Sequence, residues 1–135
     1  ECLRALLANG ADCNTKNNHG ATPLLIAALN GSLEALLILI ENGSTIDEPV
    51  DKGSTPLMAA AQNNHVECLR ALLAKGADCN AKKNNGTTAL LIAALNGSLE
   101  ALLILIENGS TIDEPNANGS TPLMAAAQNN HVECL

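Results

Sequence analysis

The chain contains no phenylalanine, tyrosine or tryptophan, although 47% of its 135 residues are hydrophobic. Aliphatic side chains and alanine must therefore build the core. Such residues favour closely packed helices, in which small side chains let the backbones approach and leucine fills the gaps. Strands, in contrast, are enriched in aromatic and β-branched residues. The missing aromatic residues thus favour an all-α fold. A chain of 135 residues is long enough for one modest domain.

Basic residues are scarce, because 7 Lys and Arg stand against 14 Asp and Glu, for a formal net charge of −7. This charge opposes binding to phosphate backbones and to anionic membrane surfaces. Lys16, Lys52, Lys82 and Lys83 lie near acidic residues in the sequence, so no continuous positive stripe forms. The apolar run 35–40 is far shorter than the roughly 20 residues needed to span a bilayer. We expect neither nucleic acid nor a membrane as a partner.

The cysteines are odd in number and form no Cys-x-x-Cys motif; they are Cys2, Cys13, Cys68, Cys79 and Cys134. No segment resembles a signal sequence, so the pattern favours a reducing compartment and an intracellular, cytoplasmic location. Each cysteine falls where a small apolar residue would pack. We therefore expect buried, inert thiols rather than a redox site.

Similar segments return along the chain with a period of 33 residues. "GATPL", "GSTPL", "GTTAL" and "GSTPL" begin at Gly20, Gly53, Gly86 and Gly119. Periods of this length are typical of solenoids, in which each unit buries its apolar face only by stacking on its neighbours. The leucine-rich and isoleucine-rich segments are therefore predicted to lie between repeats.

Each unit begins with a predicted helix, which in the first copy covers residues 23–29. Thr22 is a good N-cap for this helix, and Pro23 suits the first helical position, where its missing N–H costs nothing. Asn30 and Gly31 then reverse the chain with positive φ, and Asn64 is the usual non-glycine substitute in the next unit.

A second helix is predicted over residues 33–42, with Ser32 as its cap. Its apolar residues at i, i+1, i+4 and i+5 share the core face, whereas a mostly polar set shares the other face; the core set is Ala35, Leu36, Leu39 and Ile40, and the outer set is Glu34, Leu37 and Glu41. The following segment, "STIDEPVDKGSTP", lacks helical periodicity. Its proline and glycine predict a turn that projects from the stack.

At residues 53–82 the chain resembles an ankyrin repeat. The shared features are the Gly-x-Thr-Pro-Leu opening, the Ala-Ala pair, the His before the second helix, the Leu-Leu pair and the Gly-Ala-Asp-x-Asn close. The resemblance implies a single ankyrin-repeat domain over residues 1–135: an all-α solenoid of stacked helix-turn-helix units with projecting β-hairpin-like turns. Its predicted parts are a partial repeat 1–16, full repeats 17–49, 50–82 and 83–115, and a partial repeat 116–135.

The chain departs from the family pattern in two ways. The family usually has His after Thr-Pro-Leu, where this chain has Leu25, Met58, Leu91 and Met124. Proline is also replaced at Ala89, where we expect a looser turn.

A longer period of 66 residues covers pairs of repeats. Residues 1–69 and 67–135 differ at only nine positions, and nearly all of these lie on or beside the projecting turns. Such a pattern is expected where stacking constrains the helices and leaves the turns free to vary. It fits either a recent duplication or an engineered array.

The family resemblance implies that protein partners bind along the concave side, through turn tips and the exposed edges of the first helices. The corresponding turn positions are Asn17, Asn18, His19, Ala21, Val50, Asp51, Lys52, Ser54, Lys83, Asn84, Asn85, Thr87, Asn116, Ala117, Asn118 and Ser120. The helix-edge positions are Leu29, Gln62, Leu95 and Gln128. Leu29 and Leu95 are the best anchors, because this edge is often polar. Alternatively, the tips are merely good turn formers, since none carries Trp, Tyr or Arg.

Two further leucines, Leu37 and Leu103, are predicted to face outward. The other repeat type has Arg70 at this position, where it can pair with Glu67 one helical turn away. Single exposed leucines are ordinary, so we expect a partner at this surface only if they merge into a patch of several hundred Å².

Catalytic and metal-binding patterns are not found. His65 and Cys68 stand at i and i+3, but two ligands fall short of the four that a structural zinc site needs, and the resemblance makes His65 a structural residue. No Ser-His-Asp set, phosphate-binding loop or dinucleotide fingerprint occurs. We therefore expect no enzyme, no metal and no cofactor.

The leading prediction is a non-catalytic scaffold that binds a protein or peptide. The alternative is a structural or self-assembling repeat array, natural or engineered, with no cognate partner. Both ends of the chain fall inside a predicted second helix without a polar capping repeat. The chain is therefore either a window cut from a longer array or one whose bare ends stack head to tail.

Overall fold

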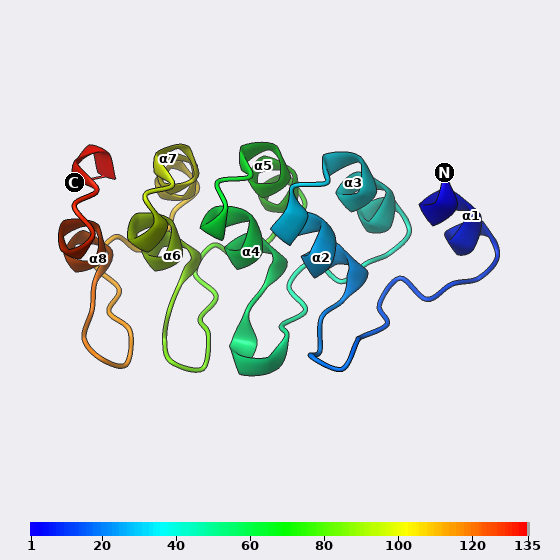
Figure 1. The fold of residues 1–135 in the computed structure, drawn as a ribbon, viewed down its shortest axis with the longest axis horizontal. Helices are drawn as coiled ribbons and strands as arrows, with labels where there is room; N and C mark the ends of the chain where they lie inside the picture. Colours follow the sequence, from blue (N-terminus) through cyan, green and yellow to red (C-terminus); the bar gives the residue numbers. More distant parts are fainter. Residues whose placement is uncertain (135) are drawn as a thin grey trace.

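The computed structural model describes residues 1–134, apart from the side chain of Asp51. Its helices form two rows, from which turns project on one side (Figure 1). The first helices of the repeats are α2 (Pro23–Asn30), α4 (Pro56–Gln62), α6 (Ala89–Asn96) and α8 (Pro122–Gln128). Second-helix sequences form α1 (Cys2–Ala8), α3 (Leu33–Glu41), α5 (Val66–Ala74) and α7 (Leu99–Glu107), and two short 3-10 turns are η1 (Asp51–Gly53) and η2 (Val132–Cys134).

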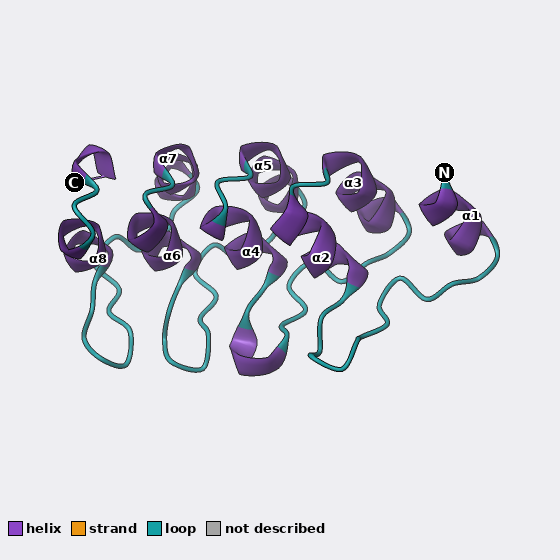
Figure 2. Cartoon of the chain, in the orientation of Figure 1, coloured by secondary structure: helices purple, strands orange, loops and turns teal. Residues whose placement is uncertain are grey.

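No strand occurs within residues 1–134, so the predicted all-α solenoid is confirmed (Figure 2). None of the helices described has the length and hydropathy needed to cross a bilayer.

A threonine caps the start of each first helix. The Oγ1 atom of Thr22 accepts a hydrogen bond from the backbone N of Leu25 at 3.3 Å, and Thr55 and Thr121 do the same in α4 and α8. The predicted looser turn at Ala89 is wrong. Thr88 Oγ1 accepts from Leu91 N at 3.2 Å, and α6 begins at the same position as the other first helices. The threonine cap alone is therefore sufficient to start this helix.

The reversal between the two helices of a repeat uses one residue with positive φ, at the predicted glycine position; Asn30, also predicted to have positive φ, instead ends α2 with a negative φ. Gly31 has φ of 70° and Asn64 has φ of 55°. Ser32 stands at the N-cap of α3, but its side chain makes no capping hydrogen bond, contrary to the prediction. In the third repeat the equivalent helix, α7, is capped from the preceding repeat, because Asn64 Oδ1 accepts from Ala101 N at 3.1 Å.

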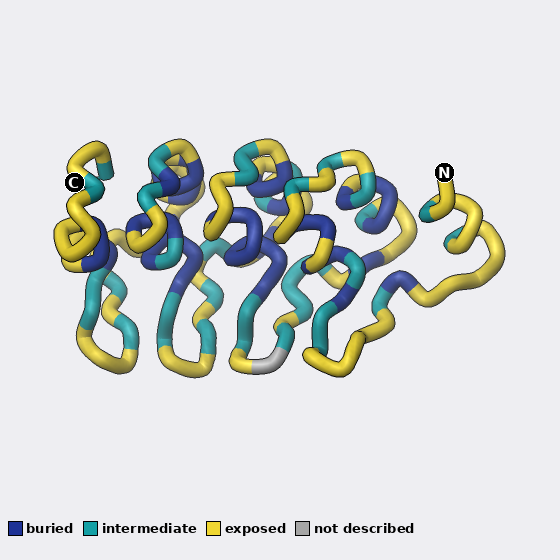
Figure 3. The backbone as a smooth tube through the Cα atoms, viewed as in Figure 1, coloured by how far each residue is buried: buried dark blue, intermediate teal, exposed yellow. Residues whose placement is uncertain are grey.

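The core lies between successive repeats, where α2 packs on α4, α4 on α6, and α6 on α8 (Figure 3). Equivalent leucines illustrate this arrangement: Leu57 in α4 is 1% exposed, whereas Leu123 in α8, which no following repeat covers in this chain, is 59% exposed. In α3, the predicted Leu36 and Leu39 are buried. Ile38, which the prediction missed, is buried as well.

The projecting turns are hairpin-shaped fingers, each closed by a backbone hydrogen bond. We define them as finger 1 (17–21), finger 2 (50–54), finger 3 (83–87) and finger 4 (116–120); the closing N–H···O=C distances are 3.0, 2.8, 2.9 and 2.9 Å. Neighbouring fingers are also joined, because Asn84 N donates to Lys52 O at 2.9 Å and Ala117 N donates to Asn85 O at 2.7 Å. These bonds hold fingers 2, 3 and 4 in register.

Candidate functional site

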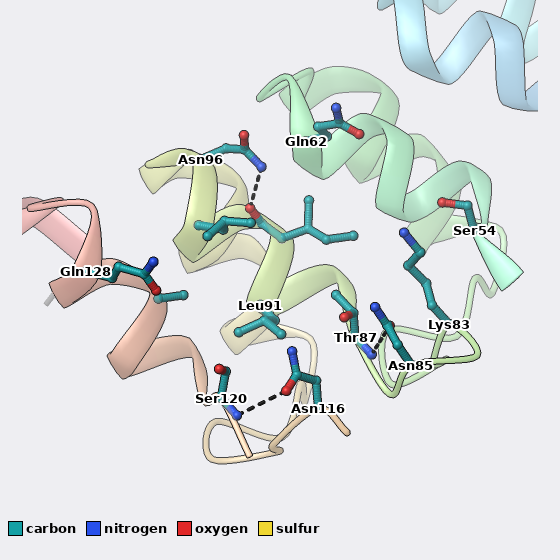
Figure 4. Close-up of a pocket in the computed structure, with 13 residues that line it drawn as sticks. Ser54, Gln62, Lys83, Asn85, Thr87, Leu91, Asn96, Asn116, Ser120 and Gln128 are labelled. Atoms are coloured by element: carbon teal, nitrogen blue, oxygen red, sulfur yellow. Dashed lines mark hydrogen bonds between the residues drawn. The ribbon is translucent and has the colours of Figure 1, made fainter. Parts of the chain in front are cut away.

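A groove of about 440 Å³ lies between the fingers and the first helices on one side of the stack (Figure 4). Three fingers and three helices contribute to it. Its finger residues are Ser54, Lys83, Asn85, Thr87, Asn116 and Ser120. Its helix residues are Gln62 from α4, Leu91, Ile92, Leu95 and Asn96 from α6, and Ala125 and Gln128 from α8.

The helix side of the groove presents an apolar ridge between amide side chains. Leu95 on α6 is 46% exposed, and Ile92 precedes it by one helical turn on the same face. Gln62 and Gln128 occupy the positions equivalent to Leu95 on α4 and α8. Because α6 lies between α4 and α8, the ridge is flanked by an amide on either side.

Asparagine side chains on the finger side shape the turns and also face the groove. Asn116 Oδ1 accepts hydrogen bonds from Asn118 N at 2.9 Å and Ser120 N at 3.0 Å, and Asn85 Oδ1 accepts from Thr87 N at 3.1 Å. Their oxygens are thus used within the turn, as the turn-former interpretation expects. Among the residues described, no group accepts a hydrogen bond from their Nδ2 atoms, which leaves these donors available to a ligand in the groove.

The groove is electrostatically distinct from the rest of the chain. Of the residues whose side chains are described, Lys83 is the one charged residue that lines it, and none of the Asp or Glu residues among them does so. Two ion pairs occur in the described part of the chain, Lys16–Glu48 at 3.4 Å and Lys82–Glu114 at 3.3 Å, and Lys83 takes part in neither. A chain of net charge −7 thus places at this groove a cation that pairs with none of the described carboxylates.

The structure brings many of the predicted binding residues together at the groove: Ser54, Gln62, Lys83, Asn85, Thr87, Leu95, Asn116, Ser120 and Gln128. The others do not line it; Val50, Lys52, Asn84, Ala117 and Asn118 belong to fingers 2 to 4, while Asn17, Asn18, His19, Ala21 and Leu29 belong to finger 1 and α2. The side chain of Asp51 lies outside the described residues.

Sequence reasoning missed Leu91, Ile92, Asn96 and Ala125. Helical periodicity could have found Ile92, because it precedes the predicted Leu95 by three residues. No equivalent signal pointed to Leu91, which is buried like a core residue. The role of all these residues in binding stays a prediction.

His65 has a structural role, as predicted. Its Nε2 atom lies 3.1 Å from the carbonyl oxygen of Leu29 in the preceding repeat, and Asn63 Nδ2 donates to the same oxygen at 3.1 Å. Within the described residues, no three side chains of His, Cys, Asp or Glu gather as metal ligands would. The suggested Glu67–Arg70 pair does not form.

The cysteines differ in burial. Cys13 and Cys68 are buried, Cys79 and Cys134 are half-buried, and Cys2 is exposed, which corrects the prediction for Cys2. Burial raises the pKa of the Cys68 thiol above its ordinary value, and the neighbouring Glu67 carboxylate raises it further. A raised pKa lowers the thiolate fraction and makes Cys68 unreactive.

Stacked two-helix units with projecting fingers and a lateral groove define a helical-repeat solenoid. The chain belongs to the ankyrin repeat family: a family model described as ankyrin repeats (3 copies) matches residues 1–83 and 75–135. Ankyrin repeats are in general protein–protein interaction modules and are typically non-catalytic scaffolds. No curated protein matches the chain significantly.

Proposed function

We propose that this chain is a non-catalytic scaffold that binds a protein or peptide partner through the groove between the fingers and helices α4, α6 and α8. The supporting observation is the apolar ridge of the half-buried Ile92 and the exposed Leu95, which amide and hydroxyl groups surround. Such a combination suits a ligand site, because apolar contacts supply affinity while a few polar groups orient the ligand.

A peptide selection tests this proposal. The wild-type chain is used to select ligands from a random 12-residue phage-displayed library, and the affinities of the selected peptides are then measured on two variants. Leu95→Asp places a charge on the ridge and should weaken binding roughly 30-fold, the effect of losing a contact of about 2 kcal/mol.

Leu29→Asp is the matched control. It makes the same change at the equivalent position of α2, which does not line the groove, and should alter affinity much less. Circular dichroism should show the helicity of both variants to be that of the wild type. Unchanged affinity in a folded Leu95→Asp variant would refute the proposal.

Self-assembly is the second candidate function. In a chain of these 135 residues, Leu123 and Met124 of α8 are 59% and 57% exposed, whereas the equivalent Leu57 and Met58 are each 1% exposed. Light scattering over a concentration series should show a growing mass if α8 stacks on a second copy, and Leu123→Glu should abolish the growth. A constant monomer mass would remove this candidate.

The thiols support a reducing, intracellular and cytoplasmic location as part of the proposal. All five cysteines are unpaired in the structure, including the exposed Cys2. Alkylation of the protein directly in its native source, followed by mass spectrometry, should find each thiol reduced. A disulfide at Cys2 or at another cysteine would contradict the proposed compartment.

A further inference from the structure

The distribution of charge around the groove restricts what can bind there. Within the described part of the chain, no Asp or Glu lines the groove, although the chain as a whole carries a charge of −7. Glu48 and Glu114 instead pair with Lys16 and Lys82, away from the groove lining. The charge that the described lining residues carry is therefore opposite in sign to the charge of the chain.

Lys83 is held where a ligand would cover it. Its backbone N donates to Thr87 O at 2.9 Å, which fixes its place at the base of finger 3. Figure 4 shows the Lys83 side chain extending from this finger towards the helix side of the groove, beside Ser54. The residue is already half-buried in the absence of any ligand.

A ligand that fills the groove must remove more water from the Lys83 ammonium group. Burial of an unpaired charge is costly, so a neutral occupant loses affinity and a basic occupant is repelled as well. A carboxylate compensates the ammonium charge directly, and the Ser54 and Thr87 hydroxyls can donate to its remaining lone pairs. Lys52 of finger 2 does not line the groove.

We propose that the groove selects an acidic peptide segment, in which an aliphatic side chain packs on Ile92 and Leu95 and an Asp or Glu carboxylate pairs with Lys83. This inference rests on the proposed binding function of the groove. It adds the chemical class of the partner, which is an acidic peptide. It also requires that the preference for acidic residues depends on Lys83.

The library selection is repeated on Lys83 variants to test this inference. On the wild-type chain, the selected 12-residue peptides should be enriched in Asp or Glu near an aliphatic residue. Lys83→Asn installs the residue that stands at the equivalent position 17 and should abolish the acidic enrichment. Lys83→Glu should shift the enrichment to Lys and Arg, because it reverses the charge.

A binding cycle on one selected peptide measures the pairing itself. Replacing its acidic residue by the corresponding amide should weaken binding to the wild type about tenfold and should have little effect on Lys83→Asn. Lys75→Asn is the matched control, since it makes the same change at the end of α5, outside the groove, and should leave the acidic preference intact.

Two outcomes would overturn the inference, and they are distinguishable. If the selected peptides lose affinity for Leu95→Asp but show no acidic preference on the wild type, the groove binds peptides and only the partner class is wrong. If no selected peptide depends on Leu95, both the inference and the proposed function fail.

Discussion

The imidazole ring of His65 fills the space that a side chain at Gly31 would need. A Cβ atom at Gly31 would lie 2.5 Å from His65 Nδ1, and the same approach recurs between Gly97 and His131 at 2.7 Å. At the intervening interface, Asn64 stands in the glycine position. Glycine therefore faces histidine where α2 packs on α4 and where α6 packs on α8. Where α4 packs on α6, asparagine takes the glycine position.

The polar contacts are different at the interface that carries Asn64, between the repeats of α4 and α6. Ser98 replaces the histidine there, and its Oγ donates to Gln62 O at 3.5 Å, a weaker version of the His65 contact with Leu29. The amide of Asn64 instead caps α7 through Ala101 N. Two different interfaces must therefore alternate, which gives the 66-residue period a steric reason.

Gly31→Asn should destabilise the chain by about 1–3 kcal/mol, because its Cβ would overlap the His65 ring in a packed interface. Backbone strain is a minor part of this cost, since Asn64 already adopts the same left-handed conformation. Adding His65→Ser recreates the pairing of Asn64 with Ser98 and should recover much of the loss.

Urea unfolding of the two single variants and the double variant gives the coupling free energy between positions 31 and 65. We expect a coupling of about 1 kcal/mol or more. Strictly additive effects would mean that the ring and the glycine are not sterically linked.

Ala89→Pro should stabilise the chain by roughly 0.4–1 kcal/mol, because proline reduces the conformational freedom of the unfolded chain. Position 89 begins α6, where a backbone N–H has no partner within the helix, and the other three first helices already begin with proline. Thr88 has φ of −105° and ψ of 168°, which suits a residue before proline. The reverse change, Pro23→Ala, serves as the control and should lower the urea midpoint; a destabilised Ala89→Pro variant would show a steric conflict.

Ser44→Ala should stabilise the chain by about 1 kcal/mol or more. The Oγ atoms of Ser44 and Ser110 are buried, and no described protein group forms a hydrogen bond with them. An unsatisfied buried hydroxyl costs about 1–3 kcal/mol. Alanine already occupies the equivalent, buried position 77, so Ala77→Ser is the matched test and should cause a comparable loss. If thermal unfolding shows Ser44→Ala to be less stable, the Ser44 hydroxyl forms a hydrogen bond with a bridging water in solution.

Stability should fall at alkaline pH in part through Cys68. Because burial raises the pKa of this thiol in the folded state above its unfolded value, its contribution to stability is complete below the unfolded pKa. That contribution is lost as the pH rises through the folded pKa. Cys68→Ala should therefore show a shallower decline in unfolding free energy above about pH 8.5, the ordinary thiol pKa.

The comparison of slopes isolates this thiol, because the other groups that titrate in this range are common to both proteins. Equal slopes would contradict the prediction, whatever the loss of absolute stability from the cavity that alanine leaves. Alkylation of the folded wild type should modify the exposed Cys2 well before the buried Cys68.

Local chemistry explains why the helices could be predicted. Thr22, Pro23 and Gly31 act within a few residues of their own positions, as a cap, a first-turn residue and a left-handed reversal, and the structure has all three in these roles. The prediction failed where a partner came from another repeat. Ser98, the equivalent of the predicted cap Ser32, makes no side-chain capping bond to α7, and Asn64 reaches across the interface to cap this helix instead.

The candidate site also has a feature that the sequence could not predict. Leu29 and Leu95 are indistinguishable in the sequence, because the residues around them are the same in both copies. They are exposed to 38% and 46%, yet only Leu95 lines the groove. Residues of fingers 2 to 4 and of α4 and α8 line the groove together with Leu95, and most of them are far from it in the chain.

The amino-acid sequence alone determined that this protein is a stack of aliphatic two-helix units, because a 33-residue period, threonine caps and left-handed glycines act locally and recur. Tertiary structure alone decided which exposed leucine lies in a groove, that Lys83 lines this groove, and that glycine faces histidine across alternate interfaces. These properties arise between repeats, where contacts form among residues more than 30 positions apart, and periodicity places such residues in equivalent positions without specifying their distances.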